Sequence, residues 1–284
     1  MPHRFRHVAR THTGPQGAPD FLSLENAKKV RRFHESFPMY QPTPLRHMPN
    51  IAKALGIADL CAKDESLRFG LNAFKVLGGS YAMGRELARR LGAPEDEITC
   101  EKISSPQTRE KLGDLTFVTA TDGNHGRGVA WTAKRFEFRS VVYMPKGSAQ
   151  ERLENIRAEG AEAAIMDMNY DEAVRLASHQ AQEQGWIVVH DTAWDGYEDI
   201  PAWIMQGYAT MGLEAYEQLP WKPTHVFLQA GVGSMAGAIA GLYASIYGED
   251  RPVVVAVEPN GADCIFRTAE ADDGGQSATL SLAI

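Results

Sequence analysis

Cysteine is scarce in this chain of 284 residues, and Cys61, Cys100 and Cys264 lie far apart in the sequence. They form no CxxC pair, so the sequence indicates neither a disulfide framework nor a zinc cluster. The adjacent carboxylates Asp64 and Glu65 lack a nearby histidine and give little indication of a metal site. We therefore expect no metal, and the absence of a disulfide framework favours a cytoplasmic location.

An excess of positive charge and long apolar runs are also absent. The chain has 36 acidic and 29 basic side chains and a net charge of −7, so general binding to nucleic acid or anionic membranes has no electrostatic support. The arginines among residues 1–20 precede no apolar run, which predicts a loose arm rather than a secretory signal. The apolar stretch 235–248 is too short to cross a bilayer. We expect a small-molecule partner, with neither nucleic acid nor membrane.

The chain does contain a regular alternation of short β-branched runs and longer segments of helical period. Strands are predicted at 115–120, 140–145, 161–167, 186–191, 225–231 and 252–259. Helices are predicted at 124–136, 148–160, 170–185 and 234–248. Strands separated by helices imply parallel pairing through crossovers, and hence an open α/β sheet with helices on both faces.

Two glycine-rich turns follow predicted strands, "TATDGNHGRG" at 119–128 and "QAGVGSMAG" at 229–237. Ligands of open sheets bind beyond the carboxyl ends of strands, where such turns lead into helix N-termini. Gly231, Gly233 and Ser234 could direct backbone N–H groups and a hydroxyl toward a phosphate, although such a turn fits tight packing equally well. The GxGxxG pattern is met only with Ala236 as its third member, which leaves NAD binding as a weaker alternative.

Lys75 follows Phe74 and precedes paired glycines in "NAFKVLGGSYA", residues 72–82, at the predicted start of a helix. One interpretation is a solvated lysine on an amphipathic helix. The other is a lysine held in a pocket to form an imine with a carbonyl cofactor, which calls for a desolvated amine with a lowered pKa.

These segments together resemble the fold-type II family of pyridoxal 5′-phosphate enzymes, and within it the 2,3-diaminopropionate ammonia-lyases. The resemblance implies two open, twisted, mostly parallel sheets with helices on both faces. It also implies a larger domain from residues 1–110 and 200–284 and a smaller domain from residues 111–199. The expected assembly is a homodimer. The matching segments are "YQPTPL", "KDESLRFGLNAFKVLGGSYA", "TATDGNHGRGVAW", "YMPKGSAQER", "DMNYDEAVRLA", "DTAWDGYEDIPAWIMQGYAT" and "QAGVGSMAG".

The same resemblance implies roles for individual residues around pyridoxal 5′-phosphate. Lys75 would carry the cofactor covalently, Phe74 would adjoin its ring, and Asn124 would hydrogen-bond its phenolic oxygen. The phosphate would bind at the turn formed by Gly231, Val232, Gly233 and Ser234.

Asp122 distinguishes this chain from the serine and threonine dehydratases, which have a small hydroxyl-bearing residue two positions before the asparagine. A carboxylate there suits the second ammonium group of 2,3-diaminopropionate, or removal of the α-proton on the face opposite Lys75, which would admit both D and L substrates. The alternative for Asp122 is an aspartate that accepts from nearby backbone N–H groups in a turn. Asp191 is expected to bind an amino group of the substrate, or else to cap a turn. His125 is expected to pack at a helix start rather than act as a base.

The predicted function is elimination of ammonia from 2,3-diaminopropionate. Two alternatives are a serine/threonine-type dehydratase and a truncated relative that binds the cofactor without turnover. The second alternative arises because the chain stops at "GGQSATLSLAI", where the family continues. The apolar final residues, Leu280, Leu282, Ala283 and Ile284, suggest a core element cut short.

Overall fold

The computed structural model describes residues 6–9 and 17–271 of the chain. Most of the predicted amino-terminal arm, and the apolar residues 280–284 expected to belong to an interrupted core element, lie outside the described residues. Within the described part, no helix combines the length and apolar character that crossing a membrane requires.

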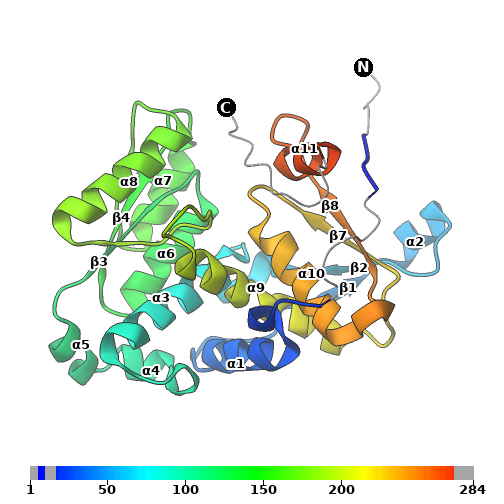
Figure 1. The fold of residues 1–284 in the computed structure, drawn as a ribbon, viewed down its shortest axis with the longest axis horizontal. Helices are drawn as coiled ribbons and strands as arrows, with labels where there is room; N and C mark the ends of the chain where they lie inside the picture. Colours follow the sequence, from blue (N-terminus) through cyan, green and yellow to red (C-terminus); the bar gives the residue numbers. More distant parts are fainter. Residues whose placement is uncertain (1–5, 10–16, 272–284) are drawn as a thin grey trace.

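A four-stranded parallel sheet occupies one side of the molecule, with strand order β5-β4-β3-β6 (Figure 1). Its strands are β3 (Thr116–Ala120), β4 (Arg139–Met144), β5 (Glu162–Ile165) and β6 (Ile187–Val188). Helices α6 (Asn124–Arg135) and α7 (Gln150–Ala158) pack on one face of the sheet, and α8 (Tyr170–Gln184) packs on the other. The prediction of parallel strands with helices on both faces is confirmed for this sheet.

Two smaller sheets lie on the opposite side of the molecule (Figure 1). Strands β7 (His225–Gln229) and β8 (Val253–Val257) are parallel, and α10 (Ser234–Tyr247) connects them. Strands β1 (Leu45–His47) and β2 (Cys61–Lys63) pair antiparallel, and α2 (Pro49–Leu55) lies between them in the sequence. The sequence pattern did not predict this strand pair.

One face of the β7–β8 pair is exposed in the described part of the chain. Residues at alternate positions share a face of a sheet, so Phe227, which pairs with Val255, lies on the same face as Val253 and Val257. Phe227, Val253 and Val257 are 65%, 56% and 51% exposed, respectively. In this part of the structure helices therefore cover only the inner face of the sheet, whereas parallel sheets usually have both faces covered.

Helices α3 (Lys75–Leu91), α9 (Asp199–Gln218) and α1 (Leu24–Glu35) pack on one another. The largest apolar cluster is continuous from these helices to the four-stranded sheet, since Phe33 and Tyr208 belong to the same cluster as Phe117. The division into domains at 110/111 and 199/200 stays a prediction. Shorter elements are α4 (Cys100–Ile103), α5 (Pro106–Leu112), α11 (Cys264–Glu270) and the 3₁₀ turns η1 (Asp20–Leu22), η2 (Glu65–Gly70), η3 (Glu95–Glu97) and η4 (Gly248–Asp250).

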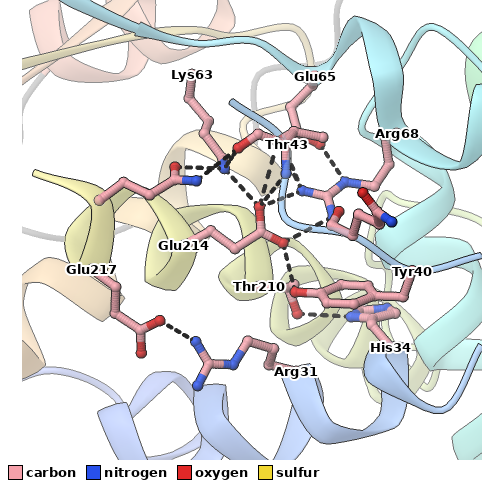
Figure 2. Close-up of polar contacts among 12 residues, drawn as sticks. Arg31, His34, Tyr40, Thr43, Lys63, Glu65, Arg68, Thr210, Glu214 and Glu217 are labelled. Carbon is pink, nitrogen blue, oxygen red and sulfur yellow. Dashed lines mark hydrogen bonds and ion pairs between the residues drawn. The ribbon is translucent and has the colours of Figure 1, made fainter. Parts of the chain in front are cut away.

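A buried ionic network joins α9 to the chain segment that leads into α3 (Figure 2). The Arg68 guanidinium, 1% exposed, donates to both Glu214 oxygens at 2.9 and 2.7 Å and to both Glu65 oxygens at 2.8 Å. Lys63 Nζ lies 2.6 Å from Glu214 Oε2, and the Tyr40 hydroxyl donates to Glu214 Oε1 at 2.8 Å. The charges are thus paired and hydrogen-bonded, which burial in a low-dielectric interior requires.

We predict that Glu214→Ala lowers the free energy of unfolding by about 3–5 kcal/mol, because it leaves the buried Arg68 charge without its bidentate partner. Urea denaturation followed by circular dichroism measures this change. Asp167→Ala is the matched control, since Asp167 pairs with Lys146 on the surface and both side chains are more than 70% exposed. Its effect should stay within about 0.5 kcal/mol. Equal effects for the two variants would contradict a supporting role for the network.

Candidate active site

Lys75 is the first residue of α3, and its Nζ lies 2.5 Å from Asp191 Oδ2. The helix start is held close to α6, because a Cβ at Gly128 would lie only 2.9 Å from Val76 Cα. Asp191 follows β6 at the carboxyl edge of the four-stranded sheet, where ligands of such sheets bind. The Lys75 side chain is 26% exposed and that of Asp191 is 6% exposed. Lys75 is therefore not a solvated surface lysine.

The charges of Lys75 and Asp191 stabilise each other. Burial disfavours the Lys75 ammonium, but the Tyr208 hydroxyl and the Asp191 carboxylate offset that cost and raise the pKa of Lys75 above its usual range. Burial also disfavours the Asp191 carboxylate, yet nearby His125 and Lys75 hold its pKa far below the usual range. The expected lowering of the Lys75 pKa is thus wrong for this structure, because sequence reasoning did not supply the buried carboxylate partner.

Aromatic side chains surround the Lys75 amine. Its Nζ lies 5.9 Å from the centre of the Phe74 ring and 5.8 Å from that of Tyr208, and these two rings pack edge to face at 5.2 Å. The Tyr208 hydroxyl is buried without a hydrogen-bond partner in the described part of the chain. A buried hydroxyl of this kind usually finds a partner, so its position beside Lys75 points to a polar ligand.

The turn at residues 231–234 leads into α10, a helix of 14 residues. Gly233 has a φ of 93°, a left-handed conformation that favours glycine. The Ser234 hydroxyl donates to the Asp191 backbone carbonyl at 2.7 Å, so this turn, Asp191 and Lys75 are directly connected. The exposed N–H groups and dipole at the start of α10 favour an anion.

A pocket of about 490 Å³ lies beside this connection. Asp191 and the turn residues Val232, Gly233 and Ser234 line it, together with side chains from α9, α10, β8 and α11. Its size is within the range of small-molecule sites. Asp191 therefore both lines the pocket and pairs with Lys75.

Asp122 lies beyond the carboxyl end of β3, in the turn that leads into α6. Asn124 is the first residue of α6 and is exposed. The Asp122 side chain is 76% exposed, and Arg152 Nη1 lies 3.3 Å from its Oδ2. Thr121 Oγ1, rather than the Asp122 carboxylate, accepts from the backbone N–H groups of Gly123 and Gly126 at 3.0 and 3.2 Å. The alternative of Asp122 as the acceptor in this turn therefore finds no support.

Two buried histidines lie near Asp191, and burial disfavours the charged form of each. His125 Nε2 lies 2.9 Å from the Val189 carbonyl oxygen, and burial lowers the pKa of His125. Burial likewise lowers the pKa of His190 to about 4. The contacts of His125 fit the predicted packing role. Asp122 and Lys75 both lie near enough to His125 to affect its pKa.

Sequence reasoning missed four residues that border the predicted site: Tyr208, Tyr170, His190 and Arg152. All four fall within or at the edge of segments that carry the family resemblance. The signal was therefore present, but nothing in the local pattern indicated that these side chains approach Lys75 or Asp122. The particular functional roles assigned to Lys75, Phe74, Asp122, Asn124, Asp191 and residues 231–234 stay predictions.

Comparison with known proteins identifies both the fold and similar enzymes. The profile of a family described as pyridoxal-phosphate dependent enzyme matches residues 37–281. The diaminopropionate ammonia-lyase of Salmonella typhimurium is 51% identical over 260 residues, which cover 89% of this chain and 64% of that protein. An L-threonine dehydratase of the same organism is 28% identical over 259 residues, 90% of this chain and 44% of the relative.

Among solved structures, the chain is similar to the Escherichia coli diaminopropionate ammonia lyase in complex with an aminoacrylate-PLP azomethine reaction intermediate. The TM-score is 0.85 at 45% sequence identity, over 93% of this chain and 67% of that one. The fold-type II architecture predicted from the sequence is confirmed. This chain spans about two thirds of the length of the ammonia-lyases that it matches.

We predict that Gly231→Ala weakens the affinity for pyridoxal 5′-phosphate by about ten- to a hundredfold while leaving stability unchanged. A Cβ at Gly231 meets no atom within 4 Å in this structure, so it should cost little in the protein alone, but it would crowd a phosphate held at the turn. Fluorescence titration and thermal unfolding measure the two quantities. Gly261→Ala, another position with open space around the Cβ, is the control. Unchanged cofactor affinity in Gly231→Ala would place the phosphate elsewhere.

Proposed function

Because the chain belongs to the family of pyridoxal-phosphate-dependent enzymes, we propose that it eliminates ammonia from 2,3-diaminopropionate, with pyruvate and ammonia as final products. The observation that carries the proposal is the direct connection between the partly buried Lys75 amine, the Asp191 carboxylate and the glycine turn before α10. A cofactor that combines a carbonyl group with a phosphate fits this connection, since an amine and an anion site are the partners that it needs.

We assign the binding of the cofactor to residues of three segments. Lys75 would hold it covalently, and Phe74 would lie against its ring. Gly231, Val232, Gly233 and Ser234 would bind the phosphate through backbone N–H groups and the Ser234 hydroxyl. Asn124 would donate to the phenolic oxygen. The Tyr208 hydroxyl supports this assignment, because it lies buried beside Lys75 and has no hydrogen-bond partner of good geometry in the described part of the chain.

The chain's own residues would orient the substrate and move protons. When bound, pyridoxal phosphate supplies a conjugated ring that takes up the electrons released at the substrate α-carbon. Asp191 Oδ2 accepts from Lys75 Nζ and thereby fixes where the amine points. Lys75 Nζ would remove the α-proton on one face and Asp122 on the other. Burial lowers the pKa of His125 and of His190, which disfavours a second positive charge beside Lys75.

The choice of a diamine substrate rests on the carboxylate at position 122 and on the similar enzymes. A second ammonium group on the substrate would find a negative charge in the turn before α6, where Arg152 orients Asp122. The ammonia-lyase from Salmonella is 51% identical to this chain, compared with 28% for the threonine dehydratase. These observations favour the ammonia-lyase over the dehydratase. Action on both enantiomers is part of the proposal and depends on bases on both faces.

We include assembly as a homodimer and a cytoplasmic location in the proposal. Both rest on the resemblance and, for the location, on the lack of a disulfide framework. Light scattering of the purified protein would measure the assembly directly.

We predict that borohydride treatment of the cofactor-loaded protein fixes the cofactor to Lys75, as determined by peptide mapping. Lys75→Arg should lower the rate of elimination at least about a thousandfold, because a guanidinium stays protonated and cannot form the covalent link. Lys146→Arg is the control, since Lys146 is a surface lysine. A label on any other lysine would refute the assignment of Lys75.

We also predict that Asp122→Asn reduces turnover of D-2,3-diaminopropionate by about a hundred- to ten-thousandfold, the usual cost of losing a general base, and reduces turnover of the L-enantiomer less. The amide is nearly isosteric with the carboxylate but cannot take up a proton, and the comparison of two enantiomers cancels general damage to the fold. Asp167→Asn, also an exposed aspartate paired with a basic side chain, serves as the control. Small and equal losses on both enantiomers would remove Asp122 from the chemistry, and a wild-type preference for serine or threonine would favour the dehydratase.

A further inference from the structure

Three side chains of types that can bind a metal ion meet at the antiparallel β1–β2 pair. Their residues do not line the pocket described above. His47 lies directly opposite Cys61 in the strand register, and Asp59 precedes β2 by two residues. We refer to them as the His47–Asp59–Cys61 cluster. Their ligand atoms lie 3.4 Å apart for Cys61 Sγ and His47 Nδ1, 3.6 Å for His47 Nδ1 and Asp59 Oδ2, and 3.7 Å for Cys61 Sγ and Asp59 Oδ2.

These separations match the edges of a tetrahedron around a metal ion. Zinc binds imidazole nitrogen and carboxylate oxygen at about 2.0–2.2 Å and thiolate sulfur at about 2.3 Å, so ligand atoms at tetrahedral angles lie roughly 3.3–3.8 Å apart. All three separations in the cluster fall within this range. One ion could therefore contact the three atoms with little movement of the side chains.

The surroundings of the cluster are those of a metal site with one open position. Asp59 directs Oδ2 to the other two ligands, while its Oδ1 accepts from the Leu60 backbone N–H at 2.8 Å, which orients the carboxylate. The Trp221 ring packs edge-on against His47 at 6.3 Å. The His47 and Asp59 side chains are 49% and 25% exposed, so solvent can reach the site and supply a fourth ligand.

We propose that the His47–Asp59–Cys61 cluster binds a divalent transition-metal ion of the zinc class, with one nitrogen, one sulfur and one oxygen ligand from the protein and a water molecule as the fourth. This donor set is borderline in softness and suits zinc better than magnesium or calcium, which prefer oxygen ligands. The bound ion would link β1 to β2 directly. The expectation that the sequence contains no metal site is revised by this proposal.

Hydrogen bonding alone is the competing explanation for the cluster. A thiol is a weak donor, and an imidazole beside a carboxylate is a common surface pair. A hydrogen-bonded cluster would not discriminate among cations and would not lose affinity for zinc when the sulfur is replaced by oxygen. The two explanations therefore differ in their response to zinc and to a Cys61 substitution.

Isothermal titration of the cofactor-loaded protein with zinc chloride, in phosphate-free buffer, tests the proposal. We expect about one zinc ion per chain at this site, and affinity at least about tenfold weaker in Cys61→Ser and in His47→Gln, since even outer-shell partners of a metal cost about 10- to 100-fold. Cys264→Ser and His225→Gln are matched controls and should bind as the wild type does, because both residues lie outside the cluster. Circular dichroism confirms that each variant is folded.

Titration with cobalt chloride identifies the sulfur ligand. A thiolate-to-cobalt charge-transfer absorption should form in the wild type and in Cys264→Ser and should be absent in Cys61→Ser. Absence of zinc binding at micromolar concentration would overturn the proposal. Zinc binding that survives both Cys61→Ser and His47→Gln unchanged would also overturn it, and would direct attention to the histidines near Lys75.

Discussion

The bidentate pair between Arg68 and Glu214 is the constraint on which the placement of the candidate active site depends. Removing a guanidinium from water costs several kcal/mol, and this structure offsets the cost with two carboxylates whose oxygens all receive N–H groups from Arg68. Apolar side chains could fill the same volume, but they would not fix the relative positions of the two segments. The planar guanidinium of Arg68 does so, because bidentate pairing with a carboxylate requires a defined geometry. The pair sets α9 against the segment that leads into α3. Tyr208 on α9 and Lys75 on α3 consequently meet at one site.

Asp191 links distant segments within the candidate active site, as the Arg68–Glu214 pair does outside it. Its carboxylate pairs with the start of α3, its backbone carbonyl accepts from the start of α10, and the residue itself extends from β6. Three segments that are distant in sequence are thus joined through the two polar groups of one buried residue. Sequence reasoning left two interpretations of Asp191, which were binding of a substrate amino group and capping of a turn. In the structure its contacts are with Lys75 and Ser234, so any contact with substrate would add to this structural function or replace part of it.

The sequence predicted the features that depend on local pattern and family resemblance. The strands and helices of the four-stranded sheet follow from β-branched runs separated by helical periods, and the helix predicted at 170–185 is α8, which Gly185 ends in the left-handed conformation. The turn at 231–234 and Lys75 were identified from short motifs. Features that depend on contacts between distant segments were not predicted: the partner that raises the Lys75 pKa, the Arg152–Asp122 pair, and the alignment of His47 with Cys61 across two strands. No spacing rule along the chain encodes such contacts, because the fold alone brings these residues together.

The exposed outer face of β7 and β8 affects how often this strand pair opens locally. Among the described residues β7 and β8 pair only with each other, and amides in a two-stranded element open to solvent more often than those of a larger buried sheet. The turn at 231–234, which is the predicted phosphate site, follows β7 closely in the chain, so local opening of this pair would separate the backbone N–H groups that are expected to face an anion. An anion that binds only the closed turn stabilises it by mass action. Ligand occupancy and the local order of this part of the chain are therefore a single linked equilibrium, and hydrogen exchange in β7 and β8 would slow as the turn fills while exchange in β3 and β4 would change little.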